Sequence, residues 1–453
     1  MSHESAHNRI FSVSTMTRQD ATSSDAQDRP APRIYSPDRS LFENPKTIDE
    51  LIPPDHKARL VWALVEDLDL TRLYEGIKSV EGHAGRPATD PRILVSLWLY
   101  ATDEHLASAH ELARRCKDCD PYKWICGGVS VNYHTLADFR VKHPEWLREQ
   151  VVTRITAMRC EGLASLDIVG QDGMRVRANA GNDSFKKADK LAQLLEDAER
   201  QWDQLQEEFE QTEQLSPRQR AARKRAARER IERIKRAQEE VKQVAEQREK
   251  RKKGDGKTAR ASTTDPEARR MKMADGGYRP AYNVEFATDL HSLVIIGADV
   301  VNAGTDSGQM EPMVQRIESE QEPLPEDAEY YADGGFAIIQ DLESVSKRGV
   351  TIFAPVREVE KKIKRGQDPY APKRSDTSWV AAWRQRMGTS KAQEKYKQRS
   401  KTEWPNATCR NRGLQQFLVR GLEKVKTVVL WYVLIHNLLR MVALRAERAI
   451  VTT

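Results

Sequence analysis

Apolar residues recur with the three-and-four spacing of amphipathic helices through the first third of the chain. The pattern is clearest over residues 56–77 and 91–116, where it predicts helices that bury one face. We therefore expect an all-helical domain over residues 39–160. Residues 1–38 are polar and lack this period, so we expect a disordered tail.

A short helix with a polar front is predicted near the end of this region. Gly127-Gly128 makes a turn, and Asn132 can cap the helix that follows. A helix, a turn and a second helix are compatible with a DNA-binding module, although a helical scaffold fits equally well. The candidate DNA contacts on this helix are Tyr133, His134, Arg140 and Lys142.

The period changes to strict alternation over residues 165–178, which predicts a strand with Asp172 near its middle. Further strands are expected near 281–288, 293–301 and from about 328 to Asp333, with helices between the later ones. Asp306 is expected to cap a helix, with Gln309 in the capping-box position. These elements predict an α/β catalytic domain that begins at 161–185 and resumes at 261–450.

Residues 186–260 interrupt this order with an expected antiparallel coiled-coil hairpin. The second arm follows Ser216-Pro217 and is strongly basic over residues 217–236. That charge is typical of a solvated helical face, and contact with DNA phosphates is the competing interpretation. The heptad seam of the first arm consists of Leu191, Leu195, Ala198, Trp202, Leu205 and Phe209.

Charge and cysteine content add little. The 74 basic and 68 acidic residues give a net charge of only +6, a weak indicator of nucleic-acid binding. Five cysteines and no apolar run of eighteen residues favour a reducing cytoplasm and no membrane span. Residues 428–444 are broken by His436 and Asn437, which we interpret as a satisfied polar pair in a buried helix. The cysteines at 116, 119 and 126 match no standard zinc spacing.

Three carboxylates carry the candidate chemistry: Asp172, Asp333 and Glu403. Spacing of three and four places Tyr396, Arg399 and Glu403 on one face of a helix expected to end near Pro405. Each acid also has a simpler interpretation, because an Asp before glycine commonly sets a turn and Glu403 can pair with Arg399. Together they suit two Mg²⁺ ions about 3.5 to 4 Å apart that act on a phosphodiester.

With these residues the chain resembles the DDE transposases of bacterial insertion sequences whose catalytic Glu lies in a Tyr-Arg-Glu-Lys signature. Arg410 stands at the position of the signature Lys. Further similar strings are GGVSVNYHTLADFR, GGYRPAYNVEFATD, VVNAGTDSGQMEPM, YADGGF, RNRGLQQFLVRGLEKV and LIHNLLRM.

The resemblance implies a ribonuclease-H-like mixed sheet in which the first and fourth strands lie side by side and bring Asp172 to Asp333. It implies Mg²⁺ (or Mn²⁺) held by Asp172, Asp333 and Glu403, with Asp172 as the bridging ligand. It also implies that Arg399 and Arg410 hold phosphates of the cut strand and that Tyr396 packs against a phosphate or a displaced base.

The implied function is a transposase that binds element ends, cleaves them and joins the 3′-hydroxyls to target DNA. Pairing two ends requires at least a homodimer. We expect the protein in the bacterial cytoplasm, associated with the nucleoid. A catalytically silent DNA-binding or architectural protein descended from a transposase is one alternative. A ribonuclease-H-fold nuclease that cleaves without joining strands is the other.

Overall fold

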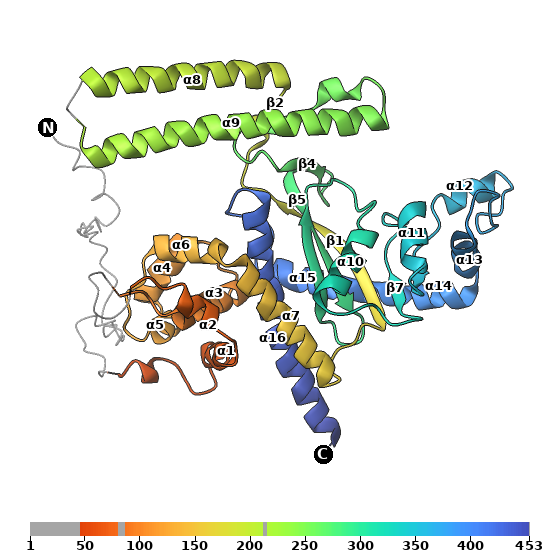
Figure 1. Cartoon of the computed structure of the whole chain (residues 1–453). Coiled ribbons are helices and arrows are strands. Elements are labelled where there is room, and N and C mark those ends of the chain that lie inside the picture. Colours follow the sequence, from red (N-terminus) through yellow and green to blue (C-terminus); the bar gives the residue numbers. More distant parts are fainter. Residues whose placement is uncertain (1–45, 80–86, 212–214, 453) are drawn as a thin grey trace, which may run out of the picture. The chain divides into compact units, whose positions relative to one another are not determined.

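The computed structural model describes residues 46–79, 87–211 and 215–452 (Figure 1). The described residues from Thr47 onward form one compact unit. The tail expected at residues 1–38 lies outside the described residues. The fold is mixed α/β, with helices first and a mixed sheet after them. The finer division into five segments made from the sequence remains a proposal.

The helical region begins with a 3-10 turn and continues through seven helices. Asn132 caps α6 as expected, since its side chain accepts the Thr135 N–H at 2.9 Å. Gly127 and Gly128 both have positive φ, 55° and 85°, which is the left-handed backbone that favours glycine. The elements are η1 (Asp49–Leu51), α1 (Lys57–Glu66), α2 (Thr71–Glu75), α3 (Pro91–Asp103), α4 (Ala109–Asp118), α5 (Asp120–Cys126), α6 (Tyr133–Lys142) and α7 (Pro144–Cys160).

A six-stranded sheet forms the centre of the second half. Strand β1 pairs antiparallel with β5 and parallel with β7, so it lies between them. Strand β5 also pairs with β4 and β6, and β7 pairs with β8. The strands are β1 (Ile168–Arg177), β4 (Arg269–Lys272), β5 (Tyr278–Asp289), β6 (Ile295–Val301), β7 (Glu329–Tyr331) and β8 (Thr351–Phe353).

Helices α10 (Met310–Glu320) and α11 (Ile339–Ser346) connect the parallel strands. The expected N-cap role of Asp306 is wrong, because α10 begins four residues later and the Met310 N–H donates to Asp341 of α11 at 3.2 Å. Gln309 makes no side-chain cap either. Asp306 instead accepts a hydrogen bond from Asn283 of β5 at 2.8 Å, so its carboxylate is directed at the sheet.

Two long helices, α8 (Ala188–Gln211) and α9 (Pro217–Arg251), pack against each other (Figure 1). Arg228 lies over Trp202 and Lys224 over Phe209, so residue numbers rise on one helix as they fall on the other. The two helices are therefore antiparallel. Their base is closed by a short ladder of β2 (Phe185–Lys186) and β3 (Ala261–Ser262), and η3 (Asp255–Thr258) lies between α9 and β3 along the chain. The coiled-coil geometry expected from the heptads stays a prediction.

The segment carrying the Tyr-Arg-Glu spacing is not one continuous helix. It divides into α14 (Ser390–Tyr396), a 3-10 turn η4 (Lys397–Thr402) and α15 (Glu403–Asn411). The expectation that the helix ends near Pro405 is wrong, because Pro405 is the third residue of α15, in the first turn, where the helix has no carbonyl partner for its N–H. Shorter helices α12 (Val359–Lys364) and α13 (Ser378–Met387) precede this segment.

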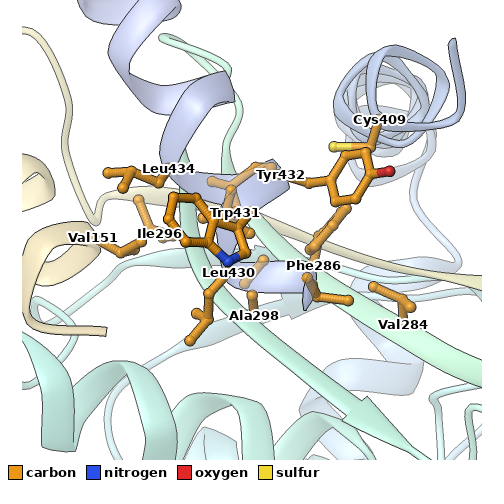
Figure 2. Packing of buried hydrophobic residues seen from close by; sticks show 14 of the residues in the cluster. Val151, Val284, Phe286, Ile296, Ala298, Cys409, Leu430, Trp431, Tyr432 and Leu434 are labelled. Carbon is orange, nitrogen blue, oxygen red and sulfur yellow. The ribbon is translucent and has the colours of Figure 1, made fainter. Parts of the chain in front are cut away.

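The last helix, α16 (Leu422–Thr452), forms the centre of the core. Figure 2 shows Trp431 and Tyr432 of α16 among Phe286 and Ile296 of the sheet and Cys409 of α15, and all five are fully or nearly fully buried. Helix α16 is long and apolar enough to cross a membrane, yet 72% of its most apolar window is buried within the chain. This burial identifies it as a core helix.

His436 and Asn437 of α16 are polar but anchored to the sheet backbone rather than to each other. Asn437 exchanges two hydrogen bonds with Ile295, at 3.0 and 2.8 Å, and His436 Nε2 lies 2.9 Å from the Leu293 carbonyl. Burial lowers the pKa of His436 to about 4, and the charges of Arg412 and Arg440 act in the same direction.

The neutral His436 predicts a specific acid sensitivity. Stability from this residue is present above the unfolded pKa of 6.5 and is lost as pH falls toward about 4. The loss should reach roughly 3 kcal/mol. In His436→Gln, which can still donate to the Leu293 carbonyl, this part of the acid dependence should disappear. Chemical denaturation at a series of pH values measures it, and an unchanged profile in the variant would place the sensitivity elsewhere.

Candidate active site and nucleic-acid interface

Asp172 lies in β1, and Asp333 lies two residues beyond the end of β7, the parallel neighbour of β1. Gly170 of β1 is paired with Tyr331 of β7, and each acid follows its strand residue by two positions. Side chains two apart in a strand share a face, so this register directs both acids to the same region beyond the end of β7. Burial raises the pKa of Asp172, and the charge of Asp333 adds to this shift.

Asp172 is surrounded by donors from η4 and α15. Its Oδ1 accepts from Arg399 Nη2 and from the Gly173 N–H, both at 3.0 Å, and its Oδ2 accepts from Asn406 Nδ2 at 3.0 Å. Thr402 makes a weak contact at 3.5 Å. Burial raises the pKa of Asp172, while Arg399 and the Gly173 N–H oppose that shift. The carboxylate is thus held in one orientation by a cation and two neutral donors.

Asp333 lies in the tight turn that follows β7. Its Oδ1 accepts the Gly335 N–H at 2.5 Å, and Arg357 donates to the carbonyls of Gly334 and Gly335 at 2.7 and 2.6 Å. Burial raises the pKa of the half-buried Tyr396, and the charges of Asp333 and Asp172 raise it further. The phenol therefore lies within the electric field of both acids.

Glu403 is the least enclosed of the three acids. Its side chain is 67% exposed, and its Oε1 lies 3.7 Å from Arg399 Nη1. Arg399 therefore contacts both Asp172 and Glu403 and neutralises part of their charge. Within the described ranges, no group of three His, Cys, Asp or Glu side chains is arranged to hold a metal ion.

Two side chains near the acids were missed in the sequence. Asn406, which lies one turn after Glu403, and Thr402, which lies one residue before it, both contact Asp172. Asn406 is buried, and its Oδ1 is without a hydrogen-bond partner in the described structure. The spacing of three between Glu403 and Asn406 was available as a signal only after α15 was known to continue through Pro405.

A cleft of about 480 Å³ adjoins Asp172 on the side of Gly173. Arg175, Arg177, Arg279 and Arg410 line it, together with Asp275 and Asp306. Arg279 is paired with Asp275 at 2.7 Å, whereas Arg177 and Arg410 are exposed and form no ion pair among the described residues. Guanidinium groups at this density suit a phosphodiester backbone.

The four residues suggested as DNA contacts on α6 occupy different environments. His134 and Lys142 are exposed, and Tyr133 stacks on His110 with ring centroids 3.7 Å apart. Arg140 is 4% exposed, lies over Trp98 and donates to the Ala107 carbonyl at 2.5 Å. A DNA-contacting role for Arg140 is therefore wrong, because its guanidinium is engaged inside the helical core.

A second cleft, of about 710 Å³, lies where the basic arm α9 meets the start of α16. Five basic residues of α9 and two from the other side line it, with Glu229, Glu232 and Glu267 as the main opposing charges. Its basic residues are Lys224, Arg225, Arg228, Arg233, Arg236, Arg420 and Lys424.

The fit between β1 and η4 predicts that Gly170 tolerates no side chain. A Cβ at Gly170 would lie 2.5 Å from Thr402 Cγ2 and 2.6 Å from Leu290 Cδ2. Gly170→Ala should lower the free energy of unfolding by about 1–3 kcal/mol. Gly181→Ala is the matched control, because nothing lies within 4 Å of that position. Equal stability of the two variants in denaturant titrations would contradict the observed packing.

Residues 46–142 match a family model described as a transposase domain (DUF772), and residues 255–438 match one described as a transposase DDE domain. The second match includes Asp333 and Glu403 and begins after the helical hairpin, so Asp172 precedes it. No curated protein and no solved structure matches the chain. The two matches show that this chain belongs to the DDE transposases of insertion-sequence type.

Proposed function

We propose that this transposase binds the ends of its element, cleaves them and joins the freed 3′-hydroxyls to target DNA, with Asp172, Asp333 and Glu403 as its catalytic acids. The carrying observation is the pairing of β1 with β7, which directs Asp172 and Asp333 to one region although 161 residues separate them in the chain. Arg399 links Glu403 to this region, because its guanidinium contacts both Asp172 and Glu403.

The strand arrangement supports a ribonuclease-H-like catalytic domain. Strands β6, β5 and β1 are antiparallel neighbours and β1, β7 and β8 are parallel neighbours, with α10 between β6 and β7 and α11 between β7 and β8 along the chain. An acid in the first strand and an acid after the first parallel neighbour fit this topology. The proposed domain consists of residues 161–185 and 261–450, with the hairpin inserted between them.

Divalent cations, Mg²⁺ or Mn²⁺, fit these residues by their donor chemistry, because three carboxylates supply the hard oxygen ligands that such ions prefer. When bound, the ions supply an activated water or 3′-hydroxyl and stabilise the leaving oxygen. Asp172 is the proposed shared ligand, since its side chain is only 16% exposed and its carboxylate is held by Arg399, Asn406 and the Gly173 N–H. The exposed Glu403 would complete the set, and its salt bridge with Arg399 leaves it accessible.

The surrounding residues orient the acids and the DNA. Asn406 and the Gly173 N–H hold the Asp172 carboxylate, which reduces the freedom it would lose on binding an ion. Arg399 offsets the repulsion between the acids and can contact a phosphate of the cut strand. Tyr396 lies close enough to both aspartates to pack against that strand.

We propose that the DNA strand leading to the acids lies in the arginine cleft beside Gly173, with Arg177 and Arg410 as phosphate contacts. The α9 cleft offers a second phosphate-binding surface at a distance along the DNA. Tyr133, His134 and Lys142 remain proposed contacts from the helical region. A complex of two ends requires two copies of the chain, so we propose a homodimer during transposition.

Asp172→Asn, Asp333→Asn and Glu403→Gln should each abolish Mg²⁺-dependent cleavage and joining of end-containing DNA. Binding of that DNA should remain, because the arginine cleft keeps its charge and the lost function is ion binding. Cleavage and strand-transfer products on gels, with filter binding alongside, measure both activities. The control is Glu447→Gln, an exposed acid at the far end of α16 that should be fully active.

The outcomes separate the possible functions. Near-normal cleavage in any one of the three variants would remove that acid from the site. Cleavage without joining in the wild-type protein would indicate a nuclease. Absence of both reactions in a wild-type protein that binds the ends would indicate a silent DNA-binding protein.

Arg177→Ala and Arg410→Ala should each weaken DNA binding about equally across sequences. Each should also reduce the slope of log K against log salt by about one, because one phosphate contact and its released counterion are lost. Arg72→Ala is the control, since Arg72 is exposed but already paired with Glu149 on the helical region. Unchanged slopes for both cleft variants would rule out this cleft as the path of the strand.

A further inference from the structure

Three oxygens from β5 and the loop before α10 converge on one point beside β1. A Cβ built on Gly173 would lie 2.9 Å from Glu285 Oε1, 3.0 Å from Asp306 Oδ1 and 3.2 Å from Asn283 Oδ1. Because residue 173 is glycine, no protein atom occupies this point. Gly173 is paired with Glu285 across the sheet, so the arrangement is fixed by strand register.

The amide of Asn283 is oriented by the two carboxylates. Its Nδ2 donates to Glu285 Oε1 at 2.6 Å and to Asp306 Oδ1 at 2.8 Å. This leaves Oδ1, on a side chain that is fully buried, without a hydrogen-bond partner among the described residues. A buried acceptor that lacks a donor is costly, so an oxygen directed at an open point indicates a missing positive partner.

The charge around this point is also uncompensated. Glu285 is 1% exposed and makes no ion pair in the described part of the chain, and neither does Asp306. The remaining Glu285 oxygen is held by Gln171 at 3.2 Å, which is itself held by Tyr330 at 2.7 Å.

The geometry points to a separate cation site formed by Asn283, Glu285 and Asp306 around Gly173. Two carboxylates and one amide oxygen are ligands for a hard divalent cation such as Mg²⁺ or Mn²⁺. The bond from Gln171 is the kind of outer hydrogen bond that orients a ligating carboxylate in metal sites. Gly173 and Asp306 line the arginine cleft, so an ion can enter from that side.

The glycine has a direct role in this inference. A methyl group at residue 173 would occupy the point where the oxygens meet without changing any charge. This site neighbours the acids of the proposed function, since a Cβ built on Gly335 would lie 2.7 Å from Asp333 Oδ1 and 3.5 Å from Asp306 Oδ2, but none of its three ligands is Asp172, Asp333 or Glu403. The two sites can therefore be tested separately.

The test measures Mn²⁺ binding to the full chain. MnCl₂ is added to the protein, and the electron paramagnetic resonance signal of the free ion reports how much is bound. The background is the triple variant Asp172→Asn, Asp333→Asn, Glu403→Gln, which lacks the proposed catalytic acids. It should bind one equivalent of Mn²⁺. Adding Gly173→Ala or Asp306→Asn should remove that equivalent, and adding Gly181→Ala should leave it.

Absence of Mn²⁺ binding in the folded triple variant, or full binding after Gly173→Ala, would overturn the site. The same pair of glycine variants in the wild-type chain gives an independent comparison: Gly173→Ala should bind one equivalent fewer than Gly181→Ala, and equal binding would overturn the proposal. If the wild type and the triple variant bind equally, the catalytic acids hold no ion while the Gly173 site stands. Circular dichroism confirms that each variant is folded.

Discussion

The position of β1 between an antiparallel and a parallel neighbour is the constraint on which the site depends. Hydrogen bonding to β7 fixes Gly170 opposite Tyr331 and so directs Asp172 toward Asp333. Hydrogen bonding to β5 fixes Gly173 opposite Glu285 and so places a second group of oxygens beside Gly173, the residue after Asp172. A slip of one residue on either side would turn these side chains to the opposite face. Strand register therefore controls both proposed ion sites.

Arg399 is the main electrostatic link between the sheet and the helices that cover it. Asp172 is half-buried and would be disfavoured as an anion without a partner, and Arg399 supplies one at 3.0 Å. The same guanidinium reaches the exposed Glu403. A cation bound by the acids would compete with Arg399 for the same carboxylates, which would free the guanidinium for a phosphate. The two proposed roles of Arg399 are thus connected through one side chain.

Local sequence signals predicted the parts of this fold that depend on neighbouring residues. The alternation around Asp172 and the cap at Asn132 agree with β1 and α6. Tertiary contacts decided the rest. Asp306 has a capping sequence, but Asp341 from α11 occupies the start of α10. The sequence around Arg140 suggested an exposed basic side chain, but Trp98 and the Ala107 carbonyl hold its guanidinium in the core. Asn406 was hidden because proline suggested a helix end where the first turn tolerates it.

The helical hairpin interrupts the catalytic sequence without disturbing β1. Its two ends leave and re-enter through the β2–β3 ladder, where Phe185 pairs with Ser262 and the Ser184 and Ser262 hydroxyls lie 2.7 Å apart. Because this ladder fixes the separation of the ends, the entropy of closing the long insertion is confined to the hairpin itself. Small apolar clusters around Leu191 and Ala198 stabilise the two helices separately from the main core. The basic face of α9 can therefore vary in charge with little effect on the register that positions the acids.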